Sequence, residues 1–337
     1  MSQRVRLVDT TMRDGSHSVA HRYTPEQVAT VAKMLDDAGV WAIAVGHGDG
    51  LGAGSRQYGF GAHSDADLLG AAAAVVERAE IAVALLPGIG TKEDLRAAHD
   101  AGATVVRVST VITEADIGIQ HLGLARELGM TAHSHLNMAS IGSVEQTVEA
   151  ARIVVDAGSV AAYLVDTCGA FLQDDVRARV SALREALDDE IAIGIHEHNN
   201  LSLAVSNSVA AIEEGATIAD VTLAGMGAGA GNCQGEALVA VLERLGIETG
   251  VDLFALQDAA DGYVRKELMP GPIVVDRLTA SMGYANVPAS FLLHAIRAGE
   301  RYGVDPRSII LELGKRQAVT GQEDMILDVA SALSAGR

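Results

Sequence analysis

One short stretch holds two carboxylates, a guanidinium and an imidazole, on Asp9, Arg13, Asp14 and His17. It directly follows residues 5–8, an aliphatic and β-branched run that predicts a first buried strand. Ionised groups are costly to remove from water unless they pair with one another or bind a metal. The stretch is therefore either a salt-bridged turn or part of a functional site, and its own residues leave both interpretations open.

A second stretch, His196-Glu197-His198, ends another apolar run. Residues i and i+2 of a strand point to the same face, roughly 6.5 Å apart along the chain, so both imidazoles can bind one cation. Asp14 can add a hard oxygen ligand from across the fold. Such a mixed set with open positions suits a divalent Mn, Fe, Co or Mg ion. The alternative is a pair of hydrogen-bonded core histidines, but two imidazoles at this spacing favour the metal.

The neighbouring side chains suggest chemistry on a carbonyl compound. Arg13 would stabilise a developing enolate oxygen, where fixed positive charge helps most, although adjacent Arg–Asp pairs are commonly surface salt bridges. His17 is a candidate general base, and its alternative is a solvated loop histidine. An imine mechanism needs a lysine in the site, and none of the chain's four lysines follows an apolar strand run. The chemistry therefore points to a metal.

Eight apolar runs alternate with helical patterns and must position these residues. One such pattern begins at Pro25 behind a Thr24 cap and ends at Gly39. Eight strand–helix units in about 250 residues predict a (β/α)8 TIM barrel, an α/β fold. A doubly wound sheet is the alternative, but no phosphate-binding fingerprint follows the first strand. The predicted strands are 5–8, 40–45, 81–86, 104–108, 130–136, 160–165, 191–195 and 218–223.

The active site of a TIM barrel forms at the carboxyl ends of its strands. We therefore expect residues 1–250 to form the catalytic barrel and residues 251–337 to form a helical domain, with helices at 253–266, 288–302, 305–314 and 322–333. At the ends of strands one, six, seven and eight the barrel brings together Arg13, Asp14, His17, Asp166, His196, His198 and Asn232.

The composition excludes several kinds of partner. With 25 basic and 44 acidic residues the formal charge is −19, which disfavours nucleic acid and anionic membrane surfaces. Two cysteines make no disulfide framework, and neither a leader nor an uncharged stretch of about 20 apolar residues is present. We expect a cytoplasmic protein.

Several motifs resemble those of the 3-hydroxy-3-methylglutaryl-CoA lyase-like family of metal-dependent TIM barrels: 9–15, 196–199 and the Gly-rich run that ends at Asn232. Within that family the chain is most similar to the 4-hydroxy-2-oxovalerate aldolases, nearly end to end. The motifs that carry this closer likeness are 13–17, 47–51, 58–60, 86–90, 113–116, 225–232, 283–284 and 321–325.

The resemblance implies a class II pyruvate aldolase that cleaves 4-hydroxy-2-oxopentanoate, or a related 4-hydroxy-2-oxo acid, to pyruvate and an aldehyde by retro-aldol chemistry through a metal-bound pyruvate enolate. Asp14, His196 and His198 would hold Mn²⁺ or another divalent ion. Arg13 would stabilise the enolate, and His17 would take the proton of the 4-hydroxyl group.

The resemblance also implies that Arg13, Thr167, His196 and Tyr284 bind the substrate, with Tyr284 helping to position it for catalysis. The helical domain would supply dimer contacts and dock an acylating aldehyde dehydrogenase, which receives the aldehyde. A homodimer or heterotetramer working in aromatic hydrocarbon catabolism is the corresponding expectation.

The chain departs from the family pattern in the stretch 133–137. His133, His135 and Asn137 stand where an apolar, Met-rich run is usual, and Thr320 replaces a glycine near the expected channel exit. These departures spare the metal and enolate machinery and leave open which aldehyde is released. Two alternatives keep the fold: an acyl-CoA-dependent Claisen-type synthase, for which no distinct CoA pocket is seen, and a non-catalytic scaffold subunit, against which the intact site residues argue.

Overall fold

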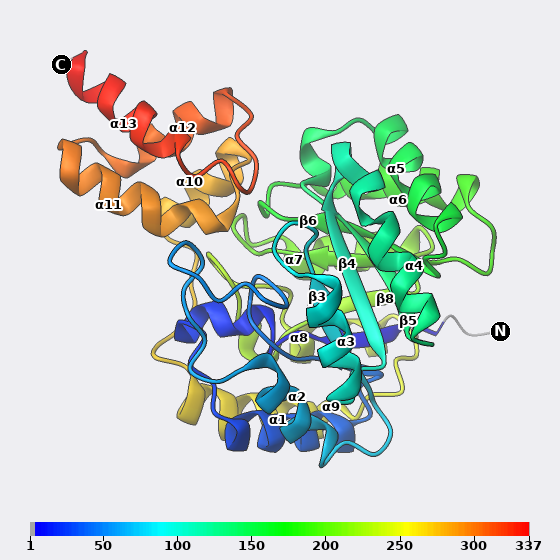
Figure 1. Cartoon of the computed structure of the whole chain (residues 1–337). Helices are drawn as coiled ribbons and strands as arrows, with labels where there is room; N and C mark the ends of the chain where they lie inside the picture. The colour runs from blue at the N-terminus through cyan, green and yellow to red at the C-terminus, as the bar shows by residue number, and fades with distance from the viewer. Residues whose placement is uncertain (1–3, 337) are drawn as a thin grey trace.

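Eight parallel strands close into one barrel, in which each strand pairs with the next in sequence and β8 pairs with β1 (Figure 1). The computed structural model describes residues 4–336. The TIM barrel predicted from the sequence is confirmed, and each strand overlaps its predicted run. The strands are β1 (Arg6–Asp9), β2 (Ala42–Ala44), β3 (Glu80–Leu85), β4 (Val105–Val111), β5 (Thr131–Asn137), β6 (Ala161–Asp166), β7 (Ala192–Glu197) and β8 (Ile218–Val221).

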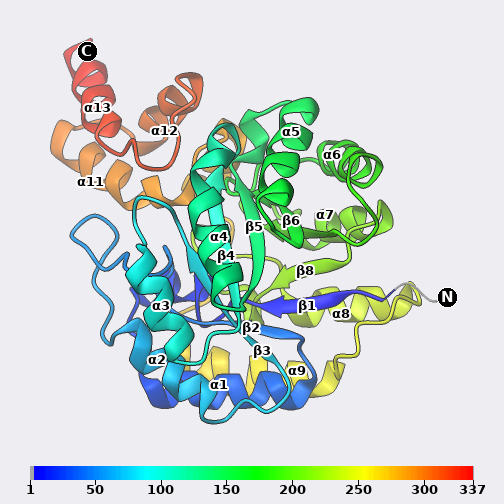
Figure 2. The same cartoon turned by 45° about the vertical axis from the view of Figure 1, so that its right-hand side comes forward.

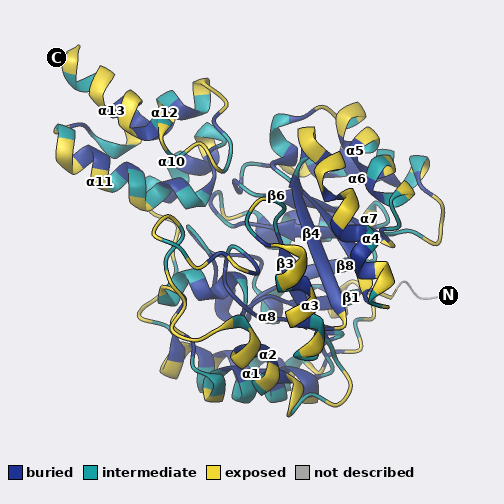
Figure 3. Cartoon of the chain, viewed as in Figure 1, coloured by how far each residue is buried: buried dark blue, intermediate teal, exposed yellow. Residues whose placement is uncertain are grey.

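Helices surround the barrel and bury their apolar faces against the strands, which are dark blue in Figure 3. They are α1 (Pro25–Ala38), α2 (Asp65–Ala73), α3 (Lys92–Asp100), α4 (Ile119–Glu127), α5 (Val144–Asp156), α6 (Gln173–Ala186), α7 (Ala204–Glu213) and α8 (Gly235–Arg244). Short 3-10 turns follow four strands: η1 (Asp14–Val19), η2 (Ile112–Gly118), η3 (Ala139–Ile141) and η4 (Leu223–Gly225).

The first helix shows how local sequence fixes an element. Thr24 accepts a hydrogen bond from the backbone N–H of Gln27, whose side chain accepts one from the N–H of Thr24. Pro25 takes the first helical position, where its missing N–H costs nothing. Gly39 ends the helix at φ 85°, a left-handed conformation that favours glycine. The predicted start and end of α1 are confirmed.

The C-terminal part of the chain is helical, as predicted, with one additional helix. Asp276 caps this helix, α10, by accepting from the backbone N–H groups of Leu278 and Thr279. Gly283 lies inside α10 and lowers its helix propensity, which explains why the sequence pattern missed it. The elements are α9 (Leu253–Asp258), the π-helix η5 (Ala259–Leu268), α10 (Arg277–Ala285), η6 (Ala289–Phe291), α11 (Leu292–Tyr302), α12 (Pro306–Lys315) and α13 (Met325–Ala335).

Two hydrophobic cores bear on where the barrel domain ends. α9 and η5 lie beyond residue 250, yet they bury Leu256 and Val264 in the core that the barrel shares with its helices. A separate core begins at Met282 and joins α10 to α13. We therefore propose a domain boundary between residues 268 and 277 in place of 250, because packing and not chain order assigns α9 and η5 to the barrel.

The helical domain lies against the barrel mouth. Figures 1 and 2 both place α11–α13 at one end of the molecule, away from the N-terminus. Ser140 Oγ donates to Asn286 Oδ1 at 2.6 Å, and Gln57 Nε2 donates to Glu323 Oε2 at 2.7 Å. These bonds link two barrel loops to the second domain across the mouth. Within residues 4–336 no helix is long and apolar enough to cross a lipid bilayer.

Asp36, at the end of α1, should contribute to stability in a pH-dependent way. Its buried carboxylate accepts from the backbone N–H groups of 77–79. Burial alone would raise its pKa, but these three donors lower the pKa below the usual value. We expect Asp36→Asn to reduce the free energy of unfolding at pH 7 by about 1–3 kcal/mol, measured by urea denaturation.

The sign of the pH dependence follows from the lowered pKa of Asp36. A carboxylate whose pKa falls on folding stabilises the protein above its unfolded-state pKa, and this contribution disappears as the pH falls through the folded-state pKa. The difference between wild type and Asp36→Asn should therefore shrink below about pH 4. The neighbouring Asp37→Asn is the control, because Asp37 is exposed and forms a surface pair with Lys33. Equal effects of both variants at pH 7 would contradict the prediction.

Candidate metal centre and active site

Asp14 reaches the barrel mouth because the turn after β1 is held by its neighbours. Asp9 ends β1 and accepts from both the backbone N–H and the hydroxyl of Thr11, at 2.8 and 3.0 Å. Burial raises the pKa of Asp9 to about 7. The two carboxylates of the stretch thus differ in role: Asp9 fixes the turn, and Asp14 begins η1 and faces the cavity.

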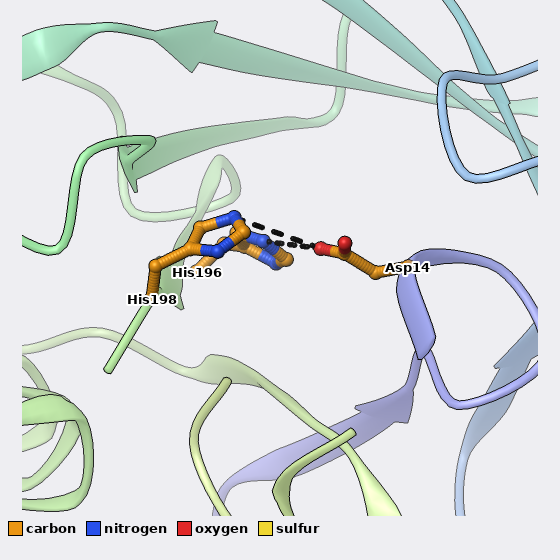
Figure 4. Close-up of side chains that lie close together, drawn as sticks. All are labelled: Asp14, His196 and His198. Carbon is orange, nitrogen blue, oxygen red and sulfur yellow. Dashed lines mark ion pairs between the residues drawn. The ribbon is translucent and has the colours of Figure 1, made fainter. Parts of the chain in front are cut away.

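Asp14, His196 and His198 converge at the mouth, as Figure 4 shows. Asp14 Oδ2 lies 3.1 Å from His196 Nε2 and 3.7 Å from His198 Nε2. All three side chains are buried. Burial alone would raise the pKa of Asp14, but Arg13 and the two imidazoles lower it well below its usual value. The carboxylate therefore stays ionised, as a metal ligand must.

His196 is oriented by a buried ion pair. Its Nδ1 donates to Asp220 Oδ2 at 2.6 Å, and Asp220 also pairs with Arg107. With Nδ1–H committed to Asp220, Nε2 is the ring nitrogen that would bind a cation, in place of its hydrogen bond to Asp14. Burial alone would lower the pKa of His196, but the hydrogen bonds to Asp14 and Asp220 raise it. Burial lowers the pKa of His198 to about 4, so that imidazole is neutral and ready to bind a cation.

The donor set fits a divalent ion. Two imidazole nitrogens and one carboxylate oxygen are the ligand types that such ions share in proteins. Neighbouring ligands of an octahedral ion, each about 2.1 Å from the metal, lie about 3 Å apart, and the separations in the triad are 3.1 and 3.7 Å. Asn232 Nδ2 donates to Asp14 Oδ2 at 2.9 Å and helps to hold the carboxylate. Glu197, between the two histidines, points away from the triad and accepts from Asn207 Nδ2.

Arg13 and His17 flank the triad. Arg13 is held by donating from one terminal nitrogen to the Gly48 carbonyl at 3.1 Å, while its other terminal nitrogen lies 3.4 Å from Asp14 Oδ2. His17 Nε2 lies 4.0 Å from Asp14 Oδ1 and 3.9 Å from Asp49 Oδ2. Gly48 permits this approach, because a Cβ there would lie 2.5 Å from His17 Nε2.

The triad lines a small cavity of about 110 Å³. Of the residues predicted for the site, the cavity brings together Arg13, Asp14, His17, Thr167, His196 and His198. Asn232 is next to it, bonded to Asp14. The placement of Asp166 in the cavity was wrong: strand alternation turns its carboxylate outward, where it accepts from the backbone N–H groups of Ala170 and Phe171.

Tyr284 does not line this cavity. It is 79% exposed on α10, and the loop that follows, residues 288–290, contributes to the cavity instead. Its predicted catalytic and substrate-binding roles therefore stay predictions. Sequence reasoning missed that loop, because nothing in its residues indicates that the helical domain folds over the mouth. It also gave no role to Ser109, which follows Arg107 by two positions on β4 and lines the cavity.

A closed parallel barrel with an acid–imidazole cluster at the carboxyl ends of its strands defines a TIM-barrel enzyme. Residues 4–262 match the HMGL-like family, and residues 273–335 match the DmpG-like communication domain. The chain belongs to the HMGL-like family and, within it, to the 4-hydroxy-2-oxovalerate aldolases. The family resemblance drawn from the motifs is confirmed.

Curated relatives support this assignment over nearly the full length. The chain is 50% identical over 335 residues to the 4-hydroxy-2-oxovalerate aldolase of Geobacillus genomosp. 3. The alignment covers 99% of this chain and 98% of that relative. The chain is 51% identical over 332 residues to the aldolase of the same name from Chloroflexus aggregans, covering 98% and 96%. The HMG-CoA lyase structure from Brucella melitensis shares the fold, with a TM-score of 0.67, 19% identity and coverage of 77% and 97%.

Proposed function

We propose that this protein is a divalent-metal-dependent pyruvate aldolase, a carbon–carbon lyase that cleaves 4-hydroxy-2-oxopentanoate or a related 4-hydroxy-2-oxo acid to pyruvate and an aldehyde. Membership of the 4-hydroxy-2-oxovalerate aldolase family supports this reaction. The observation that carries it is the convergence of Asp14, His196 and His198 in one cavity with Arg13 and His17.

Asp14, His196 and His198 would hold the ion, for which we propose Mn²⁺. When bound, a divalent ion supplies positive charge to an oxygen on which negative charge develops. Arg13 supplies a second positive charge to the same region. Its Nε is buried with no hydrogen-bond partner among residues 4–336, so it can donate to the keto acid. Thr167 Oγ1 accepts from the backbone N–H of Met138, which leaves its hydroxyl hydrogen free for the substrate.

His17 is the proposed base that starts the cleavage. Its imidazole takes the proton of the 4-hydroxyl, the C3–C4 bond breaks, and C4 becomes the aldehyde carbonyl. The electron pair of the broken bond passes to the pyruvate half, whose enolate oxygen Arg13 stabilises. Protonation at C3 then gives pyruvate. Asp49 Oδ2 lies 3.9 Å from His17 Nε2, on the side of the imidazole that faces the cavity loop 47–51.

The second domain supports a proposal about partners. The match to the DmpG-like communication domain favours an acylating aldehyde dehydrogenase as the protein that receives the aldehyde, in a heterotetramer, with a homodimer as the simpler assembly. The proposed ligands are small 2-oxo acids. We propose no nucleic-acid or membrane partner, and the cytoplasmic location remains a prediction. The Claisen-type synthase and the scaffold subunit are not favoured, since the named relatives are aldolases.

Metal dependence tests the proposed function. We expect protein stripped with a chelator to release no pyruvate from 4-hydroxy-2-oxopentanoate, and added Mn²⁺ to restore the release, followed with a lactate dehydrogenase assay. Restoration by Mn²⁺ above Mg²⁺ and Co²⁺ would support the proposed ion. Full activity without metal would rule the proposal out, and so would metal-loaded protein that cleaves neither this acid, nor its longer homologues, nor their hydroxylated analogues.

A further inference from the structure

Polar side chains occupy successive inward positions on two neighbouring strands. On β5 these are His133, His135 and Asn137, and on β4 they are Arg107 and Ser109. The register pairs Arg107 with His133 and Ser109 with His135. Barrel interiors are commonly filled by branched apolar residues, and burying polar groups is costly. Polar residues at these positions therefore need an explanation from binding or from catalysis.

The lower part of this cluster fixes the upper part through contacts of Arg107, although Arg107 Nη1 and His133 Nδ1 are buried without a hydrogen-bond partner among residues 4–336. Arg107 pairs with Asp220, and its Nε donates to His135 Nε2 at 2.9 Å. The His135 ring stacks on Tyr163, with centroids 4.2 Å apart. His135 is thus held in one orientation and one tautomer. Because Nε2 accepts from Arg107, Nδ1 carries the ring hydrogen.

The upper part of the cluster is open to a ligand. Among residues 4–336, neither the Nδ1–H of His135, the hydroxyl of Ser109 nor the side-chain amide of Asn137 has a hydrogen-bond partner. All three residues line the cavity that is also lined by the Asp14–His196–His198 triad. We call these three residues the polar wall. β4 and β5 lie opposite β1 and β8 in the barrel, so the wall faces Asp14 across the mouth.

We propose that the polar wall binds an uncharged oxygen substituent of the substrate, so that the preferred substrate is a short 4-hydroxy-2-oxo acid with a further hydroxyl group, released as a hydroxyaldehyde. This inference rests on the proposed aldolase function. The wall offers neutral donors and acceptors, which suit a hydroxyl group. It suits a carboxylate less well, because the three side chains of the wall are neutral and Arg107, behind them, pairs with Asp220.

The size and the chemistry of the site are consistent with this substrate class. A cavity of about 110 Å³ favours a short chain. Cleavage of 4,5-dihydroxy-2-oxopentanoate breaks the same C3–C4 bond and gives pyruvate and glycolaldehyde. The additional hydroxyl leaves with the aldehyde, and no oxidant, reductant or further reactant is needed.

A pair of substrates of equal length tests the inference. In 4-hydroxy-2-oxohexanoate a methyl group replaces the 5-hydroxyl of 4,5-dihydroxy-2-oxopentanoate. We expect the Mn²⁺-loaded protein to show a kcat/KM at least about fivefold higher for the dihydroxy acid, since an unmatched polar wall disfavours the methyl group. Pyruvate release measures both rates. A preference for the hexanoate, or equal rates, would overturn the inference.

Variants of the wall assign the preference to its residues. Asn137→Leu and His135→Phe should each lower the ratio of the two kcat/KM values by about threefold or more. Asn137→Leu is the safer variant, because His135→Phe also removes the acceptor for Arg107. Thr110→Val is the matched control: Thr110 is the β4 residue after Ser109, its side chain does not line the cavity, and the ratio should not change. An unchanged ratio in Asn137→Leu would contradict the inference.

The two proposals fail in different ways. If metal-loaded protein cleaves 4-hydroxy-2-oxopentanoate and the hexanoate faster than the dihydroxy acid, the aldolase function stands and only the polar-wall inference is lost. If it cleaves none of the three acids while the metal is bound, the proposed function is lost, and the inference with it.

Discussion

Asp14→Asn should abolish metal binding and lower kcat/KM for pyruvate release by about a thousandfold or more. Asp14 contributes the only carboxylate of the triad, and an amide oxygen in its place carries no net charge. The stabilisation that a bound ion gives to developing charge is worth several kcal/mol, and each 1.4 kcal/mol, roughly, is a factor of ten in rate. Metal analysis of the purified protein and the pyruvate assay measure the two effects independently.

Glu197→Gln is the matched control for Asp14→Asn. Glu197 is a buried carboxylate between the two histidines, but its side chain lies on the opposite face of β7 and accepts from Asn207. Burial raises its pKa well above the usual value, which favours the neutral carboxyl group that an amide resembles in shape and charge. This variant should keep its metal and most of its activity. Asp14→Asn protein that retains a full complement of metal would exclude Asp14 as a ligand.

The triad was predictable because its geometry is set by local rules. A strand places His196 and His198 on one face, and the barrel rule brings Asp14 to the same mouth. Both rules can be applied without knowing any long-range distance. The same strand alternation excludes Asp166, and applying it to β6 with the right register would have done so in advance, since Val165 and Thr167 line the cavity.

The buried Arg107–Asp220 ion pair that orients His196 was not predicted, although the sequence contains an indication of it. Arg107 and Asp220 are 113 positions apart, and only the closed barrel makes them partners. Each is the one charged residue of its buried strand, and two opposite charges so placed are expected to pair. The position of Tyr284 had no such sign, because it depends on how the second domain meets the barrel.

His17→Asn should leave metal binding intact and lower kcat for cleavage by about a hundredfold to ten-thousandfold, the range that positioned proton transfer contributes. His17 is not a member of the Asp14–His196–His198 triad, although its Nε2 lies 4.0 Å from Asp14 Oδ1. Its side chain is 23% exposed, so the proton it takes can pass to solvent. Metal content, pyruvate release and binding of oxalate, a mimic of the enolate, distinguish loss of the base from loss of the site. Activity within tenfold of wild type would exclude His17 as the base.

Two further variants separate the imidazole of His17 from its surroundings. His21→Asn removes a neighbouring ring, 4.8 Å away, that does not line the cavity, and it should cost less than His17→Asn. Gly48→Ala keeps the imidazole of His17 but adds a Cβ only 2.5 Å from the present position of its Nε2, so the His17 side chain must move. Metal retention with a lowered kcat in Gly48→Ala would show that the position of the base, and not only its presence, is needed, because proton transfer requires hydrogen-bond reach of the 4-hydroxyl.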